Sequence, residues 1–255
     1  MPLRTLLGRR ATMPPSTGLV VHALHKSASM FLYKFFCDLC ERLDCPFHSI
    51  HNRPANDASV PKSIGHSFVL CPVRSFNCNS YQFSQLDQVR YLLQIRDPRD
   101  ILVSEYFSLG WLHTSKNWSE EALQRREKIQ NMSIDEFVLQ EPHGKTPLLE
   151  RYRPALELTE GTNVRFVKYE TLVTRFPEWL ENVLDLLGLS DEKRLKQKLL
   201  QRYRDEFQLD ESDNHKRNIL PGDHKEKLKP ETIQKLDQRF QAVLQRFDYK
   251  LSGTS

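Results

Sequence analysis

Two segments of the chain share an order of elements that leaves few folds open. In the first, an apolar run at residues 19–24 precedes a short polar loop and a helix-spaced apolar pattern at residues 31–43. In the second, an apolar run at residues 91–95 precedes Pro98, which suits the first position of a helix because its missing N–H costs nothing there. A third strand is expected at residues 164–167. This alternation predicts an α/β fold, a parallel sheet flanked by helices on both sides.

Length and composition agree with one globular domain. The chain has 255 residues, of which 39% are hydrophobic and 27% charged, so it can bury a substantial core. We expect a disordered or leader segment at residues 1–17 and a single domain at residues 18–255. Residues 71–84 are expected to form a loop. Residues 110–130 are polar and weakly patterned, which predicts a mobile region.

The charge of the chain argues against some classes of protein. The formal net charge of +4 is mild, and basic and acidic residues alternate along most of the sequence. A nucleic-acid binder usually has a dense basic face, whereas this pattern suits a modest anionic ligand. No apolar segment is long enough to cross a bilayer. We therefore expect neither a nucleic-acid partner nor a membrane span.

The cysteines indicate a reducing compartment. The chain has five cysteines, which is an odd number. The apolar part of its N-terminal segment is too short for a secretory signal. Both features favour a cytoplasmic protein, although an organelle-targeting leader stays open. Cys37 and Cys40 form a CxxC pair, but no second pair completes a tetrahedral site, so we expect no metal.

Polar residues that follow the strands carry the functional signal. Ligands of parallel sheets bind beyond the carboxyl ends of the strands, and Lys26, Arg96 and Tyr169 stand at such ends. The backbone amides of residues 27–30 would open a helix, where an anion is favoured, and Lys26 adds a positive charge. Arg96 and Ser104, two helical turns further on, could share one phosphate. The pattern predicts a ligand with two separated anionic ends.

Each of these residues also has a structural interpretation. The serines of the first loop could simply form a turn and a helix cap. Arg96 could pair with Asp100, and Ser104 could face the core. Lys216 and Arg217 lie in a later loop and could close over the same ligand, or form a solvated charge pair. The argument for a site rests on their common place at the strand ends.

At these residues the chain resembles the sulfotransferases that use 3′-phosphoadenosine 5′-phosphosulfate (PAPS). Their Lys-Ser-Gly-Thr-Thr-Trp loop is similar to Lys26-Ser27-Ala28-Ser29-Met30-Phe31. Their Arg-Asp-Pro-Arg-Asp-Val-Leu-Val-Ser motif is nearly reproduced by Arg96-Asp97-Pro98-Arg99-Asp100-Ile101-Leu102-Val103-Ser104. Their Tyr-Glu-Asp-Leu resembles Tyr169-Glu170-Thr171-Leu172, and their late Arg-Lys-Gly loop resembles the stretch that begins at Arg217. The likeness implies a P-loop-like sulfotransferase fold from about residue 19 to residue 251.

The resemblance also implies roles for individual residues. Arg96 and Ser104 would bind the 3′-phosphate, and Tyr169 would lie near the nucleotide. Phe31 takes the place of an aromatic residue near the adenine. The 5′-phosphosulfate would be surrounded by Lys26, Ser27, Ala28, Ser29 and Met30. The late loop would help to hold the 3′-phosphate through Lys216, Arg217 and Asn218. The family needs no metal, and PAP is the desulfonated product.

The chain departs from the family pattern in three places. Ala28 and Met30 replace Gly and Thr in the first loop, which removes one hydroxyl donor. Asn218 and Ile219 replace Lys and Gly in the late loop. The Thr-His-Leu-Pro segment of the cytosolic members, whose His serves as base, has no clear counterpart, since its expected place is occupied by Cys71-Pro72-Val73-Arg74.

The implied reaction is in-line sulfuryl transfer from PAPS to a hydroxyl or amine of a small-molecule or carbohydrate acceptor. Lys26 would stabilise the charge on the leaving oxygens, and a histidine would take the acceptor's proton. We favour His51 as this base, with His48 and His66 left open. Two other functions remain: a kinase-like phosphotransferase and a catalytically silent PAPS or PAP binder. The sequence indicates neither the acceptor nor the oligomeric state.

Overall fold

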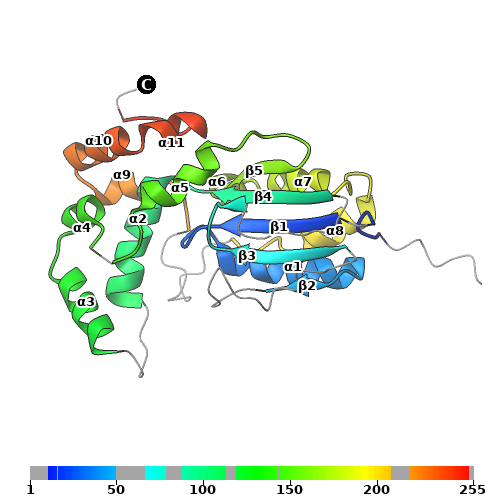
Figure 1. Ribbon diagram of the computed structural model, residues 1–255, viewed down its shortest axis with the longest axis horizontal. Helices are drawn as coiled ribbons and strands as arrows, with labels where there is room; N and C mark the ends of the chain where they lie inside the picture. The colour runs from blue at the N-terminus through cyan, green and yellow to red at the C-terminus, as the bar shows by residue number, and fades with distance from the viewer. Residues whose placement is uncertain are drawn as a thin grey trace, which may run out of the picture.

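Five parallel strands form one sheet in this computed structural model, which describes residues 11–15, 17–49, 67–78, 88–112, 119–142, 144–207 and 219–252. The strand order is β2-β3-β1-β4-β5. The strands are β1 (Thr17–Ala23), β2 (Phe47–His48), β3 (Phe68–Val73), β4 (Gln88–Ile95) and β5 (Val164–Lys168). The predicted α/β fold with a parallel sheet and flanking helices is confirmed (Figure 1).

The helices fall into two groups. The first packs along the sheet and comprises α1 (Ser29–Leu43), α6 (Tyr169–Thr174), α7 (Phe176–Leu186) and α8 (Lys193–Arg202). The second, which we call the helical group, lies at the end of the sheet to which the strand arrows point (Figure 1). It comprises α2 (Pro98–Phe107), a π-helix (Ser108–Leu112), α3 (Glu120–Gln130), α4 (Ile134–Gln140), α5 (Leu148–Leu156), α9 (Asp223–Lys227), α10 (Pro230–Arg239) and α11 (Gln241–Arg246).

The position of β1 sets where a ligand can bind. This strand lies at the centre of the sheet and pairs in parallel with β3 on one side and β4 on the other. Leu19, for example, is in register with Val69 of β3 and with Arg90 of β4. After β1 the chain therefore forms β2 and β3 on one side of this strand, and later β4 and β5 on the other side. Such a switch point is where open α/β sheets bind their ligands.

Alternate residues of the strands belong to different clusters of the hydrophobic core. Leu19, Val21 and Ala23 pack against residues of α1, α7 and α8 on one face of the sheet. Leu93 and Ile95 of β4 pack against the helical group on the other face. This period of two is what buried strands with helices on both faces require.

In two segments the local structure differs from what the sequence pattern suggested. The polar stretch at residues 110–130 contains the end of the π-helix and all of α3, which begins after the capping hydroxyl of Ser119. Most of α3 is exposed, so it has only a weak apolar stripe by which to recognise it. The expected loop at residues 71–84 is also shorter at its start, because β3 continues through Val73.

The ends of the chain add two observations. The predicted boundary at residue 17 stays a prediction, although Thr17 already belongs to β1 and Met13 is buried against the first core. Over the part of the chain that the structure describes, no helix is long and apolar enough to cross a membrane.

Candidate nucleotide-binding site

The loop after β1 opens α1 toward the carboxyl edge of the sheet. Lys26 and Ala28 both hold left-handed backbone conformations, with φ of 68° and 61°, and Ala28 is the N-cap of the helix. Within the described residues, no side chain caps α1. The first amide groups of this 15-residue helix are thus open to an anion, which the helix dipole also favours.

Ser27 supplies a hydroxyl with no visible task in the protein alone. Its side chain is fully buried, and its amide donates to the carbonyl of Leu24 over 3.2 Å. Its Oγ has no hydrogen-bond partner among the described residues. A buried polar atom without a partner is uncommon and costly, so it calls for a ligand atom or a water.

Arg96 follows β4 and contacts both the loop after β1 and Tyr169, the residue after β5. Its Nη1 donates to the carbonyl oxygen of Lys26 over 2.5 Å, and its guanidinium lies 4.0 Å from the centre of the Tyr169 ring. The side chain is only 4% exposed, and its Nε has no partner within the described part of the chain. Arg96 is therefore fixed in place with donor capacity to spare.

The remaining residues of the Arg-Asp-Pro-Arg-Asp motif hold the helical group in position. Asp97 caps α2 by accepting from the amide of Arg99 over 2.9 Å. The Arg99 side chain pairs with Asp97 and, over 2.5 Å, with Asp237 of α10. Asp97 and Arg99 are both buried, so these ion pairs fix the start of α2 against α10.

Asp100 connects α2 to the segment at residues 222–224. Its carboxylate accepts from the amides of Gly222 and His224 over 2.7 and 2.9 Å, and it contacts the His224 Nδ1 at 2.6 Å. Burial alone would raise the pKa of Asp100, but these partners and the charge of Arg96 hold that pKa at about 2. The alternative in which Arg96 forms an ion pair with Asp100 is not seen in the described structure.

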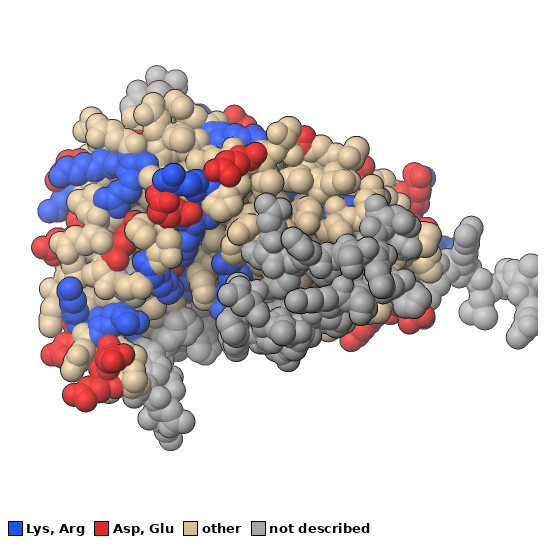
Figure 2. Space-filling model, in the orientation of Figure 1, with Lys and Arg blue, Asp and Glu red and all other residues tan. Residues whose placement is uncertain are grey.

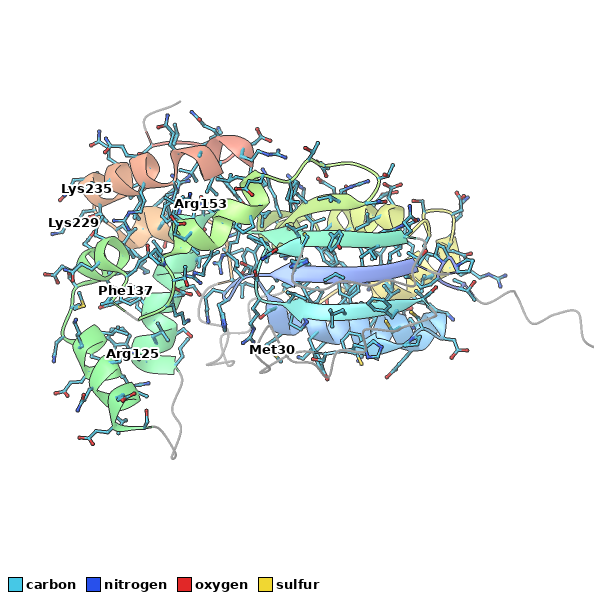
Figure 3. The ribbon with its side chains drawn as sticks, in the orientation of Figure 1. Met30, Arg125, Phe137, Arg153, Lys229 and Lys235 are labelled. Carbon is cyan, nitrogen blue, oxygen red and sulfur yellow. The ribbon has the colours of Figure 1, made fainter. Side chains whose placement is uncertain are left out.

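A cavity of about 350 Å³ lies where the loop after β1, α2 and the end of β5 meet. Its volume falls in the range of small-molecule sites. Eight predicted residues line it, namely Lys26, Ala28, Ser29, Met30, Phe31, Arg96, Ser104 and Tyr169. The remaining lining residues are Lys34, Leu112, Glu206, Phe207 and Ile219. Met30 lies at the start of α1, where that helix comes closest to the helical group (Figure 3).

Two aromatic residues border the cavity in different ways. Phe31 is 7% exposed and belongs mainly to the core, where its ring lies 4.8 Å from that of Phe207. Tyr169 is buried, which raises the pKa of its hydroxyl, and that hydroxyl donates to the carbonyl of Ile219 over 2.8 Å. Tyr169 thus connects the cavity to Ile219 of the predicted late loop.

Several predicted residues cannot be placed on the cavity. Lys216, Arg217 and Asn218 lie outside the described residues, as do His51 and His66. His48 is described, and it sits on β2 at the edge of the sheet with its ring 6.0 Å from that of Phe68. It does not line the cavity.

Ser108 is a functional candidate that the sequence reasoning missed. The Lys26 Nζ donates to the Ser108 Oγ over 3.0 Å, so the π-helix orients the lysine that the first loop presents. Ser108 follows Ser104 by one helical turn, and this spacing along the helix expected after Asp97 was an available signal. Lys34 follows Met30 by the same interval and was missed for the same reason.

The family model described as "Sulfotransferase domain" matches residues 76–248 of the chain. This match spans more than half of the sequence, and it includes the whole Arg-Asp-Pro-Arg-Asp motif. The chain therefore belongs to the sulfotransferase domain family. No curated protein gives a significant sequence match.

Solved structures agree with this family in their fold. Mouse sulfotransferase SULT7A1, solved as a complex with PAP, superposes with a TM-score of 0.59 at 14% identity, over 94% of this chain and 91% of that one. Retinol dehydratase in complex with retinol and PAP gives a TM-score of 0.51 at 17% identity, over 92% and 82% of the two chains. The identities are low, so these likenesses speak for the fold.

Proposed function

We propose that the protein is a PAPS-dependent sulfotransferase that transfers a sulfuryl group to a hydroxyl or amine of a small-molecule or carbohydrate acceptor. The observation that carries this proposal is the shared cavity of the Lys26 loop, Arg96 and Ser104. An adenosine nucleotide with a 5′ and a 3′ anionic group on one ribose needs two anion-binding ends that lie close together. The hydrogen bond from Arg96 to the carbonyl of Lys26 brings these ends together.

The polar atoms of the site fit such a nucleotide. The Oγ of Ser27 and the Nε of Arg96 are buried without partners among the described residues, and they belong to the two ends of the proposed site. We assign the 5′-phosphosulfate to the residues around the helix start, Lys26, Ser27, Ala28, Ser29 and Met30. We assign the 3′-phosphate to Arg96 and Ser104, with the late loop of Lys216, Arg217 and Asn218 as further donors.

When bound, PAPS would supply the sulfuryl group and leave as PAP. Lys26 would place its ammonium at the oxygens on which negative charge develops, because Ser108 holds its Nζ beside α2. The start of α1 would add its uncapped amides at the same point. His51 remains the proposed proton acceptor, and His66 its alternative.

All five cysteines are free thiols, which supports the cytoplasmic setting expected from the sequence.

A transfer assay tests this function. The protein is mixed with PAPS carrying a radioactive sulfur and with a panel of phenols, amines and sugars. We expect label in at least one acceptor, and a loss of roughly 10²–10³ in kcat for Lys26→Ala, because a charge-stabilising donor is removed. Lys235→Ala, an exposed lysine of α10 shown in Figure 3, serves as the control and should retain full activity.

Two results would reject the proposal. Tight PAP binding without label in any acceptor would indicate a silent binder. Transfer of phosphate from labelled ATP, with none from PAPS, would indicate a phosphotransferase.

A further inference from the structure

A second set of charged side chains lies beside Lys26 and Ser104 of the proposed nucleotide site. We call it the basic cluster and define it as His25, Arg74, Lys145 and Arg151, gathered around the carboxylate of Glu105. His25 directly precedes Lys26, and Glu105 directly follows Ser104. The cluster thus borders the two residues that the nucleotide site uses at its centre.

The members come from three separate parts of the fold. His25 follows β1, and Arg74 follows β3, the neighbour of β1 on the side opposite β4. Lys145 lies three residues before the start of α5, and Arg151 lies on α5. Arg96 stands at the end of β4, so the nucleotide residues and Arg74 flank β1 on opposite sides. Figure 2 shows Lys and Arg side chains gathered over α5 and near the ends of the strands.

The geometry of the cluster is fixed by one ion pair. Arg151 holds Glu105 through two contacts, Nη1 to Oε1 at 3.2 Å and Nη2 to Oε2 at 3.3 Å. The Lys145 Nζ lies 3.7 Å from the same carboxylate, and an Arg74 nitrogen lies 3.4 Å from the His25 Nε2. Glu105 is almost fully buried, so the pair with Arg151 is a rigid support.

Among the described residues of the cluster, positive charge exceeds negative charge. Among the described groups that act on His25, three are cations and Glu105 is the one carboxylate. Burial, followed by the charges of Arg74 and Lys145, lowers the pKa of His25 to about 4, so the imidazole is neutral at physiological pH. Burial also lowers the pKa of Lys145. The charge of Glu105 opposes this shift, whereas the charges of Arg151 and Arg74 add to it. Like charges held together in a partly buried space are costly, and a bound anion would offset that cost.

We propose that the basic cluster binds a carboxylate group of the acceptor, so that the enzyme prefers acceptors with a carboxylate near the reacting hydroxyl. This inference rests on the proposed function, because the acceptor must approach the sulfur from the side of Lys26 that the nucleotide leaves open. Arg74 offers a planar fork that matches a carboxylate, and Lys145 offers a mobile charge. Arg151 acts through Glu105, whose position it sets.

Matched pairs of acceptors test the inference. The first pair is 4-hydroxyphenylacetate and 4-hydroxyphenylacetamide, and the second is methyl glucuronide and methyl glucoside. For each pair we measure kcat/KM with PAPS and, by calorimetry, binding to the PAP-saturated protein. We expect at least one pair to favour its carboxylate member by about tenfold or more, which is typical of a charge-assisted hydrogen bond.

Variants then connect the preference to the cluster. Arg74→Gln and Lys145→Gln should each reduce the preference to about threefold or less and leave the neutral acceptor nearly unchanged. Lys145 is 38% exposed in its side chain, so its variant keeps the test valid if Arg74→Gln fails to fold. Arg153→Gln is the control, since Arg153 is an exposed arginine of the same helix that pairs with Glu150 (Figure 3).

The outcomes separate this inference from the proposed function. If label is transferred but no carboxylate member is favoured in either measurement, the inference is wrong and the sulfotransferase assignment stands. If the Gln variants keep the preference of the wild type, the cluster is not the site. If PAP does not bind and no label is transferred, the proposed function fails and this inference fails with it.

Discussion

Lys26 and Ala28 adopt left-handed backbone conformations that residues other than glycine rarely hold. Such a conformation costs roughly 1–2 kcal/mol per residue, and strain of this kind gathers at ligand sites. The alternation of conformations between residues 26 and 28 turns the chain sharply from β1 into α1. It also leaves the start of α1 without a capping side chain, and so open to a ligand.

Ala28→Gly should stabilise the protein. Glycine adopts a φ of 61° without the clash of a β-carbon, so we expect the free energy of unfolding to rise by about 1 kcal/mol. Urea unfolding measures this change. The same substitution at Ala242, an exposed residue of α11, should act in the opposite direction, since glycine weakens a helix. A loss of stability for Ala28→Gly would show that the loop is not strained.

The candidate site residues differed in how well they could be predicted from the sequence. Arg96 and Ser104 stand in a long, specific motif, and both line the cavity. Ser108, Arg74 and His25 belong to no such motif, and their roles depend on which loops the fold brings together. Spacing alone marks Ser108, whereas only the order of strands makes Arg74 a neighbour of His25.

At the scale of elements, α2 organises the site. Its first turn carries Arg99, which pairs with Asp237 of α10, and Asp100, which accepts from the amide groups at Gly222 and His224. The N-terminus of α2 is therefore joined to two C-terminal elements by buried carboxylates. These contacts hold the segment that reaches Tyr169 beside the cavity.

Asp100→Asn should lower stability in a way that depends on pH. The pKa of Asp100 is about 2 in the folded protein and about 4 in an unfolded chain. A lowered pKa means that the ionised carboxylate contributes stability fully above pH of about 4, and that this contribution is lost as the pH falls toward 2. We expect the variant to be less stable at pH 7 by about 2 kcal/mol, as this shift implies.

Urea unfolding of both proteins between pH 7 and pH 2 measures the difference. The gap between wild type and Asp100→Asn should narrow below pH of about 4. Asp191→Asn, at an exposed position, is the control and should show little change at any pH. A gap that stays constant with pH would mean that the ionised form of Asp100 has no special role.

The elements themselves were predictable where their pattern was strong. The strand and helix on either side of residue 26, and those on either side of Arg96, follow from apolar runs and a proline at the helix start. The helix α3 was missed because it is mostly exposed and packs weakly on the core. Its one clear signal was the capping serine, Ser119, followed by two glutamates.

At the scale of the whole molecule, the helical group meets the sheet at the carboxyl ends of the strands (Figure 1). The candidate site lies where they meet. The order β3-β1-β4 places the loop after β1 between the ends of two other strands. Arg96 and Tyr169 reach that loop from β4 and from the end of β5. On the other side of β1, Arg74 follows the end of β3. The carboxyl ends of the strands thus carry the proposed nucleotide site on one side of Lys26 and the basic cluster on the other.

The central claim is that one nucleotide is held by two anion-binding ends at once, and a binding comparison tests it most directly. Calorimetry gives the affinity of PAP and of adenosine 5′-phosphate, which lacks the 3′-phosphate, for wild type, Arg96→Ala and Ser104→Ala. Arg96 also contacts the loop through the carbonyl of Lys26, so its loss should weaken both ligands to some degree. Ser104→Ala leaves that contact intact. We predict that both variants weaken PAP about tenfold more than adenosine 5′-phosphate, because a contact to the 3′-phosphate is lost. Equal weakening of the two nucleotides in both variants would contradict the account.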